Sequence, residues 1–283
     1  MKRSYTSYAS VAGDLTLFFQ DGREYLLVPL YNADRKAVRN YRDGSLYLFD
    51  SLSGKLIKKT TIADTPLSGV LVLPHKDGPI VIGATTPGTL FAVDLMSGKY
   101  YWKRVLAGRN GGTPVLTRVN DTWFLLVGDA FGTAWVLDPV TGDVRWTKKT
   151  GLFIKGSMAV YPPGRLMAVP SEDRFVHLFG LPDGTPKGTI KTGKYINSAP
   201  LFLSAGERVT LLTASMDEKL YWVDLKTMKP IQVFKTSPLR WKYEKRAVAT
   251  WSSPQAVETD GTVYLLYGDM GGVFRCYKSS GLK

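Results

Sequence analysis

Few side chains in this sequence could do chemistry. The chain holds two histidines, His75 and His177, and a single cysteine, Cys276. Metal binding and general-base catalysis usually draw on a histidine with a positioned partner, yet His75 lies in the turn LPHKDGP and His177 in an apparent strand. One cysteine excludes an internal disulfide and a cysteine-based metal site. We therefore predict no catalytic residue and no metal site, and we expect Cys276, in VFRCYK, to be a buried structural thiol.

The glycine-rich stretch GRNGGTP, residues 108–114, could suggest a phosphate-binding loop. It lacks the Lys-Ser/Thr pair of such a loop and precedes an apparent strand, whereas a phosphate loop opens a helix. No nucleophile elbow is visible, although the sequence leaves a Ser-His-Asp triad open. We expect these glycines to form a connection without a ligand, and the residues identify no small-molecule substrate.

A repeat accounts for most of the chain. The aligned copies are YLFDSLSG from Tyr47, FAVDLMSG from Phe91, WVLDPVTG from Trp135, HLFGLPDG from His177 and YWVDLKTM from Tyr221. The first four turn glycines, Gly54, Gly98, Gly142 and Gly184, follow one another at intervals of 44, 44 and 42 residues. Each unit holds about four short β-rich runs separated by Gly, Pro, Asp and Asn, which is typical of an all-β array. A unit of this length and content predicts the blade of a β-propeller.

The repeat count predicts an all-β fold, a six-bladed β-propeller with four-stranded blades in a single domain, residues 1–283. The expected blades are residues 15–60, 69–105, 114–148, 157–191, 200–235 and 254–277. The last unit supplies only three good strands, so we expect residues 2–10 to add its outer strand. That addition would close the ring, place the termini side by side and remove free sheet edges.

Acidic residues recur at one loop of successive units. They are Asp129, Glu172, Asp173, Asp217, Glu218 and Asp269. Such residues could ring a cation site near the mouth of the channel, but Asp and Asn in loops more often hydrogen-bond their own backbone and shape the turn. We expect the structural role.

The pattern G-x-L/V-Y/F-x-x-D-x-x-T/S-G-x-x-x-W resembles the repeat of the pyrroloquinoline-quinone-type propellers. The best copies are GTAWVLDPVTGDVRW and GTLFAVDLMSGKYYW. The resemblance covers essentially the whole chain in degenerate form, and it implies that tryptophans pack between blades. Trp102 and Trp146 occupy the tryptophan position, and Ile190, Val233 and Lys58 fall near it in the weaker copies.

That family contains quinone-dependent dehydrogenases and also non-enzymatic scaffolds of the outer-membrane assembly lipoprotein type, which carry the repeat without a cofactor. The quinoprotein alcohol dehydrogenases are longer and use a vicinal disulfide, with carboxylates and an amide on Ca²⁺. This chain has one cysteine and no matching cluster. We therefore expect no cofactor.

Two insertions break the period, Tyr31 to Gly44 within the first blade and Thr236 to Trp251 between the fifth and sixth blades. Insertions in repeat proteins map to loops, often on the binding face. The predicted partner-binding residues are Arg35, Lys36, Arg39, Tyr41, Arg42, Arg240, Trp241, Lys242, Tyr243, Lys245 and Arg246. Blade-to-blade crossovers on the same face add Arg109, Lys155 and Lys194, while the acidic loops nearby predict a modest net potential.

The formal net charge of +13 favours an acidic partner. We therefore expect a non-catalytic scaffold or protein-interaction module that binds an acidic protein through the basic and aromatic loop face, within a larger assembly. Two alternatives stay open: an enzyme using the central channel, either a quinone-dependent oxidoreductase or a hydrolase, and a nucleic-acid-binding propeller. No apolar run predicts a transmembrane helix. No secretory signal is visible, so we expect a cytoplasmic protein, or a periplasmic one if a leader was removed.

Overall fold

The computed structural model describes residues 9–11, 15–32, 44–62, 70–75, 78–85, 88–235, 252–260, 262–268 and 274–279. Within them, the strands form six antiparallel sheets. The first sheet contains β1 (Ala9–Val11), β2 (Thr16–Gln20), β3 (Arg23–Asn32), β4 (Gly44–Asp50) and β5 (Leu56–Ile62). The second contains β6 (Leu71–Leu73), β7 (Ile80–Ala84), β8 (Thr89–Asp94) and β9 (Tyr100–Val105).

The later sheets repeat this arrangement. The third contains β10 (Val115–Val119), β11 (Thr122–Gly128), β12 (Thr133–Leu137) and β13 (Val144–Lys149). The fourth contains β14 (Ala159–Tyr161), β15 (Leu166–Pro170), β16 (Phe175–Gly180) and β17 (Pro186–Lys191), with a short 3₁₀ helix at Pro162–Gly164. The fifth contains β18 (Leu201–Ala205), β19 (Arg208–Ser215), β20 (Lys219–Asp224) and β21 (Lys229–Lys235), and the sixth contains β22 (Gln255–Thr259), β23 (Thr262–Gly268) and β24 (Phe274–Ser279).

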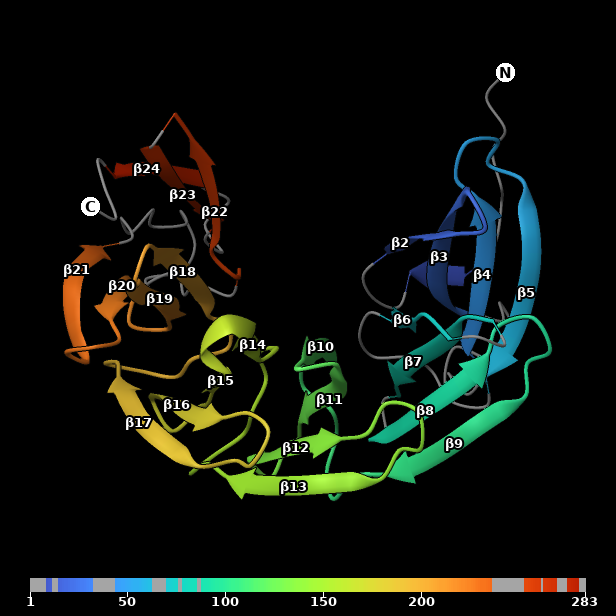
Figure 1. The fold of residues 1–283 in the computed structure, drawn as a ribbon, viewed down its shortest axis with the longest axis horizontal. Helices are drawn as coiled ribbons and strands as arrows, with labels where there is room; N and C mark the ends of the chain where they lie inside the picture. Colours follow the sequence, from blue (N-terminus) through green and yellow to red (C-terminus); the bar gives the residue numbers. More distant parts are fainter. Residues whose placement is uncertain are drawn as a thin grey trace, which may run out of the picture.

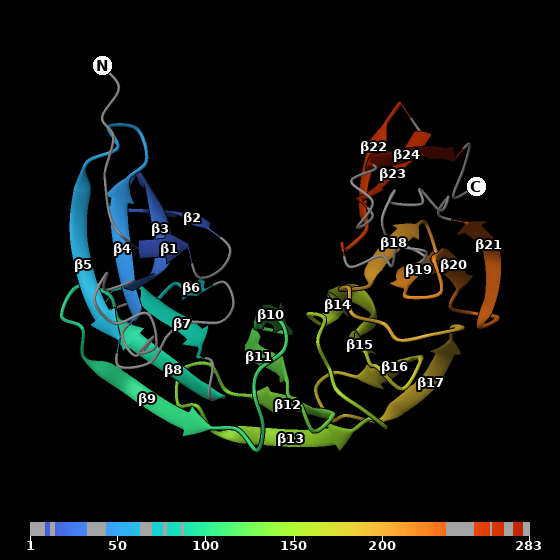
Figure 2. The same cartoon turned by 180° about the vertical axis from the view of Figure 1, so that it is seen from behind.

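The six sheets follow one another around a common centre, which confirms the predicted all-β propeller architecture (Figure 1). The last strands of the first five sheets, β5, β9, β13, β17 and β21, lie on the outside. Both ribbon views show an open arc, with the first and sixth sheets on opposite sides of a gap (Figure 2).

The predicted closure of the ring by the N-terminal segment is wrong for its described residues. Ala9 and Ser10 lie in β1, which pairs with β3 of the first sheet and not with the sixth sheet. β3 is long enough to accept β2 along Arg23–Leu27 and β1 along Leu30–Asn32, so the N-terminal strand continues the line of β2. Pairing with a strand nearby in sequence closes a short loop, which costs less entropy than pairing with the distant end of the chain.

Each of the strongest repeat motifs forms a tight turn between the third and fourth strands. In the third sheet, Asp138 Oδ1 accepts hydrogen bonds from the backbone N–H groups of Val140 at 2.9 Å and Thr141 at 3.2 Å. The N–H of Gly142 donates to the Asp138 carbonyl at 2.9 Å. Gly142 has φ +76°, a conformation that glycine adopts without strain. The aspartate and the glycine of the repeat are therefore turn-forming residues.

Consecutive sheets pack face to face through five hydrophobic clusters. Each cluster draws its buried residues from two neighbouring sheets, as Leu126 and Val136 of the third sheet pack with Met167 and Phe179 of the fourth. Alternation of side chains along each strand supplies one apolar face to the preceding sheet and the other to the following sheet. This two-sided burial explains the continuous apolar character of the second strands, such as β11.

Two tryptophans join neighbouring sheets, as the repeat resemblance implied. Trp102 Nε1 donates to the Pro139 carbonyl at 3.0 Å, and Trp146 Nε1 donates to the Pro182 carbonyl at 2.5 Å. Each ring covers the turn glycine of the next sheet: a Cβ on Gly142 would lie 2.5 Å from the Trp102 ring, and one on Gly184 would lie 2.9 Å from the Trp146 ring.

Strand register corrects the predicted tryptophan position in the weaker copies. Trp102 and Trp146 oppose Ala92 and Val136, and the equivalent partners in the fourth and fifth sheets are Gly188 and Gln232. Ile190 and Val233 are therefore displaced from it, whereas Lys58 was placed correctly. The register shift falls at the same place in all five ladders, so this position lies four residues after each turn residue, whereas Ile190 and Val233 lie six and five residues after Gly184 and Met228.

Gly142→Ala is expected to lower the free energy of unfolding by about 2 kcal/mol more than Gly54→Ala. Both glycines have positive φ at the same turn position, so both variants carry the strain of a left-handed alanine, about 1 kcal/mol. Only at Gly142 must the added methyl also displace a tryptophan, because nothing lies within 4 Å of a Cβ on Gly54. Urea unfolding of both variants measures the difference, and equal losses would contradict the packing role.

Candidate protein-interaction face

The eleven predicted partner-binding residues lie outside the described part of the chain, in residues 33–43 and 236–251. The strands that border these stretches are described. The first stretch connects β3 to β4, and the second lies in the connection from β21 to β22. Their positions in the topology, within the first sheet and between the fifth and sixth sheets, are thus the predicted ones.

The described crossovers between sheets lie beside the turns that join second to third strands. The N–H groups of Ala130, Glu172 and Met216 donate to the carbonyls of Arg109 at 2.8 Å, Phe153 at 2.9 Å and Tyr195 at 2.9 Å, respectively. Each bond links a turn to the crossover that precedes its sheet. We call the surface formed by the crossovers 106–114, 150–158 and 192–200 and the turns 129–132, 171–174 and 216–218 the crossover face.

Asp129, in a turn of this face, is fully buried at 0% exposure. Its Oδ1 accepts hydrogen bonds from the N–H groups of Phe131 and Thr133, both at 2.9 Å, and its Oδ2 accepts one from Trp135 Nε1 at 2.8 Å. Both carboxylate oxygens are therefore engaged inside the third sheet, as the predicted structural role requires.

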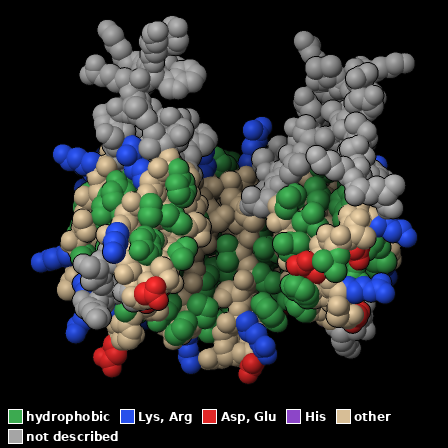
Figure 3. All heavy atoms as spheres, turned by 90° about the horizontal axis from the view of Figure 1, so that it is seen from above, with side chains coloured by type: hydrophobic (Ala, Val, Ile, Leu, Met, Phe, Trp, Pro, Cys, Tyr) green, Lys and Arg blue, Asp and Glu red, His purple; other side chains and the backbone are tan. Residues whose placement is uncertain are grey.

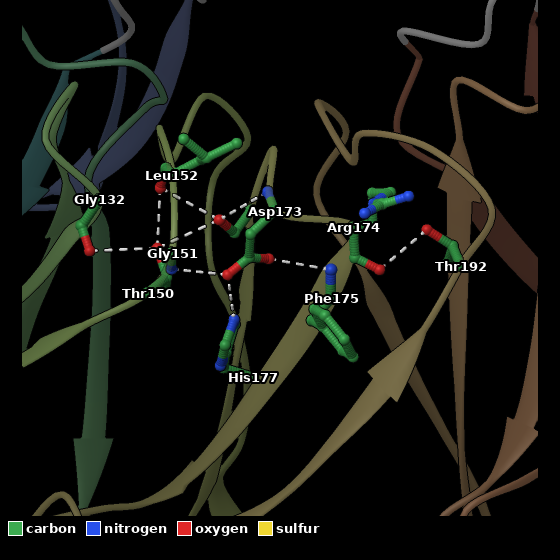
Figure 4. A network of polar contacts seen from close by, with 10 residues as sticks. Gly132, Thr150, Gly151, Leu152, Asp173, Arg174, Phe175, His177 and Thr192 are labelled. Atoms are coloured by element: carbon green, nitrogen blue, oxygen red, sulfur yellow. Dashed lines mark hydrogen bonds and ion pairs between the residues drawn. The ribbon is translucent and has the colours of Figure 1, made fainter.

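Asp173 repeats this arrangement and adds a link to the crossover that precedes its sheet (Figure 4). Its Oδ2 accepts the Gly151 N–H at 2.6 Å and lies 2.7 Å from His177 Nε2, and its Oδ1 accepts the Phe175 N–H at 3.0 Å. Burial raises the pKa of this carboxyl, but the bonds from Gly151, His177 and Phe175 outweigh burial and hold the pKa of Asp173 below its ordinary value. His177 is thus the structural histidine that the sequence predicted.

Asp217 forms the third copy. Its Oδ2 accepts the Gly193 N–H at 3.0 Å and the hydroxyl of Tyr221. Burial, followed by the bond to Asp217 and its charge, raises the pKa of Tyr221 to about 12. In all three copies, a turn aspartate holds a polar atom of a ring on the third strand. The sequence shows the aspartates and the rings Trp135, His177 and Tyr221, but their pairing needs the fold.

Asp173→Asn is expected to make folding less sensitive to acid. The folded pKa lies below the ordinary value of 3.8, so the carboxylate contributes stability above that pH, and this contribution is lost as the pH falls below 3.8 through the folded pKa. Urea midpoints of wild type and variant should differ most at neutral pH and converge in acid. A difference in urea midpoint that stays the same at every pH would contradict the role of the Asp173 carboxylate. The same convergence in acid for the exposed control Asp260→Asn would contradict it too.

The glycine-rich stretch connects the second sheet to the third and packs against the next crossover. A Cβ on Gly112 would lie 2.6 Å from the Ser157 backbone nitrogen, and a Cβ on Gly156 would lie 2.6 Å from the Ser198 carbonyl oxygen. Successive crossovers therefore nest backbone to backbone, and glycine is needed where they touch.

The charged residues of the crossover face differ in exposure: three cations are exposed, whereas the acidic residues are buried or partly exposed. Asp129, Asp173 and Asp217 point their carboxylates into hydrogen bonds below the surface, and Lys155 pairs with Glu172 at 2.6 Å. Arg109, Arg174 and Lys194 are exposed, and none forms an ion pair with another described residue. Exposed apolar side chains lie among them, namely Phe131, Leu152 and Tyr195.

No group of three or more His, Cys, Asp or Glu side chains in the described ranges is placed to hold a metal ion. His75 packs edge-on to the ring of Tyr101, with their centroids 6.3 Å apart. The described part of the chain likewise contains no helix with the length and apolar character needed to cross a membrane.

Comparison with known families identifies the repeat. The model of the family described as outer membrane protein assembly factor BamB matches residues 42–274, which is most of the chain. This chain belongs to the BamB family. Its repeats are those of a pyrroloquinoline-quinone-type propeller, as the motif predicted.

Solved structures show the same architecture as this BamB-family chain. BamB from Moraxella catarrhalis matches at 19% identity with a TM-score of 0.63, over 96% of this chain and 77% of that one. Sqt1 from Saccharomyces cerevisiae matches at 10% identity with a TM-score of 0.70, over 91% and 69% of the two chains. The computationally designed protein Ika8 matches at 13% identity with a TM-score of 0.65, over 95% and 71%. No curated protein sequence matches this chain.

Proposed function

We propose that this chain is a non-catalytic propeller scaffold that binds an acidic protein partner through the crossover face. The observation that carries the proposal is the separation of charge on that face. The three turn aspartates are engaged in hydrogen bonds below the surface, while Arg109, Arg174 and Lys194 are exposed and unpaired among the described residues. Guanidinium and ammonium groups in such positions bind carboxylates, and the neighbouring Phe131, Leu152 and Tyr195 offer apolar contact area.

The two insertions extend this surface in the proposal. Residues 33–43 connect a second to a third strand, and residues 236–251 belong to a crossover, which are the two connection types that form the crossover face. They contribute eight further cations, Arg35, Lys36, Arg39, Arg42, Arg240, Lys242, Lys245 and Arg246, and four aromatic residues, Tyr41, Trp241, Tyr243 and Trp251. The family description, an assembly factor, fits a partner within a multi-protein assembly.

A charge-reversal experiment tests the proposal. Arg109→Glu, Arg174→Glu and Lys194→Glu together are expected to lower the affinity for poly-L-glutamate about a hundredfold at low salt. The matched control changes Lys55, Lys99 and Lys229 to Glu, which alters the net charge equally at exposed positions next to the opposite turns. Equal losses in both variants would show binding by net charge alone and would contradict a specific face.

A second arm separates the partner classes. A variant with Arg240, Trp241, Lys242 and Arg246 changed to Ala should lose the acidic protein that co-purifies with the wild type. A single-stranded oligonucleotide, measured at the same ionic strength, tests the nucleic-acid alternative, whose affinity falls steeply with salt. Tighter binding of the oligonucleotide than of poly-L-glutamate would overturn the choice of a protein partner.

A further inference from the structure

Every interface between consecutive sheets uses the same two sets of positions. In the third sheet, the facing pair Leu126 and Val136 packs on the fourth sheet, and the adjacent pair Leu125 and Leu137 packs on the second. We call the side of a sheet that meets the next sheet its outgoing face and the other side its incoming face. Side-chain alternation along the strands makes the two faces distinct.

The same register positions recur through the arc. The outgoing pairs are Leu27 with Leu48, Ile82 with Ala92, Leu126 with Val136, Ala168 with Leu178, and Leu212 with Trp222. The incoming pairs are Val81 with Val93, Leu125 with Leu137, Met167 with Phe179, Leu211 with Val223, and Leu265 with Tyr277. All of them belong to the five clusters.

The outgoing face of the sixth sheet continues this series, and no other described sheet packs on it. Leu266 pairs with Cys276 two positions from the pair Gly268 and Phe274, just as Leu126 pairs with Val136 two positions from Gly128 and Ala134. Phe274 is 70% exposed, whereas its counterpart Ala134 is fully buried. Val257, on the same face, is 51% exposed. Cys276 is also exposed, so the prediction of a buried thiol is wrong, because no sheet of the described residues covers this face.

The incoming face of the first sheet is the missing complement. Its pair is Leu26 with Phe49, and Leu17 of β2 stands opposite Leu26. Leu17 is 59% exposed and Phe19 is 77% exposed, while Phe18, on the other side of the same strand, packs into the cluster shared with the second sheet. Exposed apolar surface of this kind on a sheet face marks an interaction site.

We propose that the incoming face of the first sheet binds the outgoing face of the sixth sheet of a second copy of this chain, head to tail. The two faces are the two halves of an interface that the fold already builds five times, so their complementarity is set by the repeat. Within one chain they lie apart on either side of the gap, and Figure 3 looks into this gap and shows a hollow between two lobes that both carry hydrophobic side chains. A second copy presents both halves, and such a heterologous contact forms rings or open chains of subunits.

Sedimentation velocity over a range of concentrations tests the proposal with three variants at exposed positions. Phe19→Asp places a charge on the incoming face and Val257→Asp places one on the outgoing face. Each is expected to raise the dissociation constant of the wild-type assembly about a hundredfold, because an unpaired charge would be buried in an apolar interface. The control Leu52→Asp changes a side chain that is 89% exposed at a turn, and it should assemble like the wild type.

Mixing the two interface variants is the decisive experiment. Phe19→Asp and Val257→Asp subunits each keep one intact face, so the mixture should form a capped one-to-one complex and nothing longer. A wild type that stays monomeric at every concentration would overturn the proposal. So would a disulfide formed within one chain between Cys276 and a cysteine placed at Leu17, since the sheets would then close on each other. Loss of assembly in Phe19→Asp with none in Val257→Asp would show packing between two first sheets and would equally overturn it.

Discussion

Asp129→Ala is expected to lower the free energy of unfolding by about 4 kcal/mol. The substitution removes both carboxylate oxygens and leaves the N–H groups of Phe131 and Thr133 and the indole N–H of Trp135 without their acceptors. Asp129 is fully buried, so the space left behind cannot restore these bonds from bulk solvent without opening the turn. Urea unfolding followed by tryptophan fluorescence measures the loss, and a fluorescence change in the native state should accompany it.

Two further variants separate the lost hydrogen bonds from a general effect of removing a turn aspartate. Asp138→Ala removes an aspartate that also accepts two backbone N–H groups, but at a half-exposed turn where water can replace it. We expect a loss of about 1 kcal/mol there. Asp129→Asn retains one acceptor oxygen and should fall between the two. A loss at Asp129→Ala no larger than that at Asp138→Ala would contradict the role of the buried carboxylate.

Gly156→Ala is expected to cost about 3 kcal/mol, a large effect for one methyl group. The added Cβ would lie 2.6 Å from the Ser198 carbonyl oxygen and 3.0 Å from the Pro170 ring. A backbone carbonyl cannot swing aside as a side chain can, so the crossovers before the fourth and fifth sheets would have to separate. Thermal and urea unfolding measure the loss.

A matched control exists in the sixth sheet. A Cβ on Gly268 would lie 3.8 Å from the nearest described atom, Ser252 Oγ, and the backbone φ of Gly268 is not positive. Gly268→Ala should therefore leave the free energy of unfolding nearly unchanged. Similar losses for both variants would indicate that the crossovers yield easily, against the nesting described for Gly112 and Gly156.

The repeat predicted most of the fold because its signals are local. An aspartate and a glycine at fixed spacing form the same turn wherever they occur, as at Asp138 and Gly142, and alternating apolar runs form strands buried on both faces. The wrong placement of Ala9 and Ser10 has a different origin. Which edge a short strand joins depends on the length of the strand beside it, and the pairing of β1 with the far end of β3 cannot be read from a turn motif.

The interaction face was predicted less completely, also for physical reasons. The sequence places Asp129, Asp173 and Asp217 in turns and Arg109 and Lys194 in crossovers, and all of these positions are confirmed. It could not show that Gly151 N–H and His177 both point at Asp173, because the first donor comes from the crossover that precedes the fourth sheet. This contact holds the Asp173 carboxylate partly buried, whereas Arg109, Arg174 and Lys194 are exposed. Arg174 was missed, since a single arginine within a turn carries no pattern.

Five clusters shared only by consecutive sheets give the molecule the energetics of a one-dimensional array. Opening an interior sheet breaks two interfaces, whereas opening the first or the sixth breaks one, so the free energy of local opening rises from the ends toward the middle. Arg109, Arg174 and Lys194 sit on connections of the interior sheets. The cations of the crossover face therefore lie in the part of the arc that opens least often. A partner of the proposed kind would meet a surface that folding has already ordered, so binding would cost little further conformational entropy.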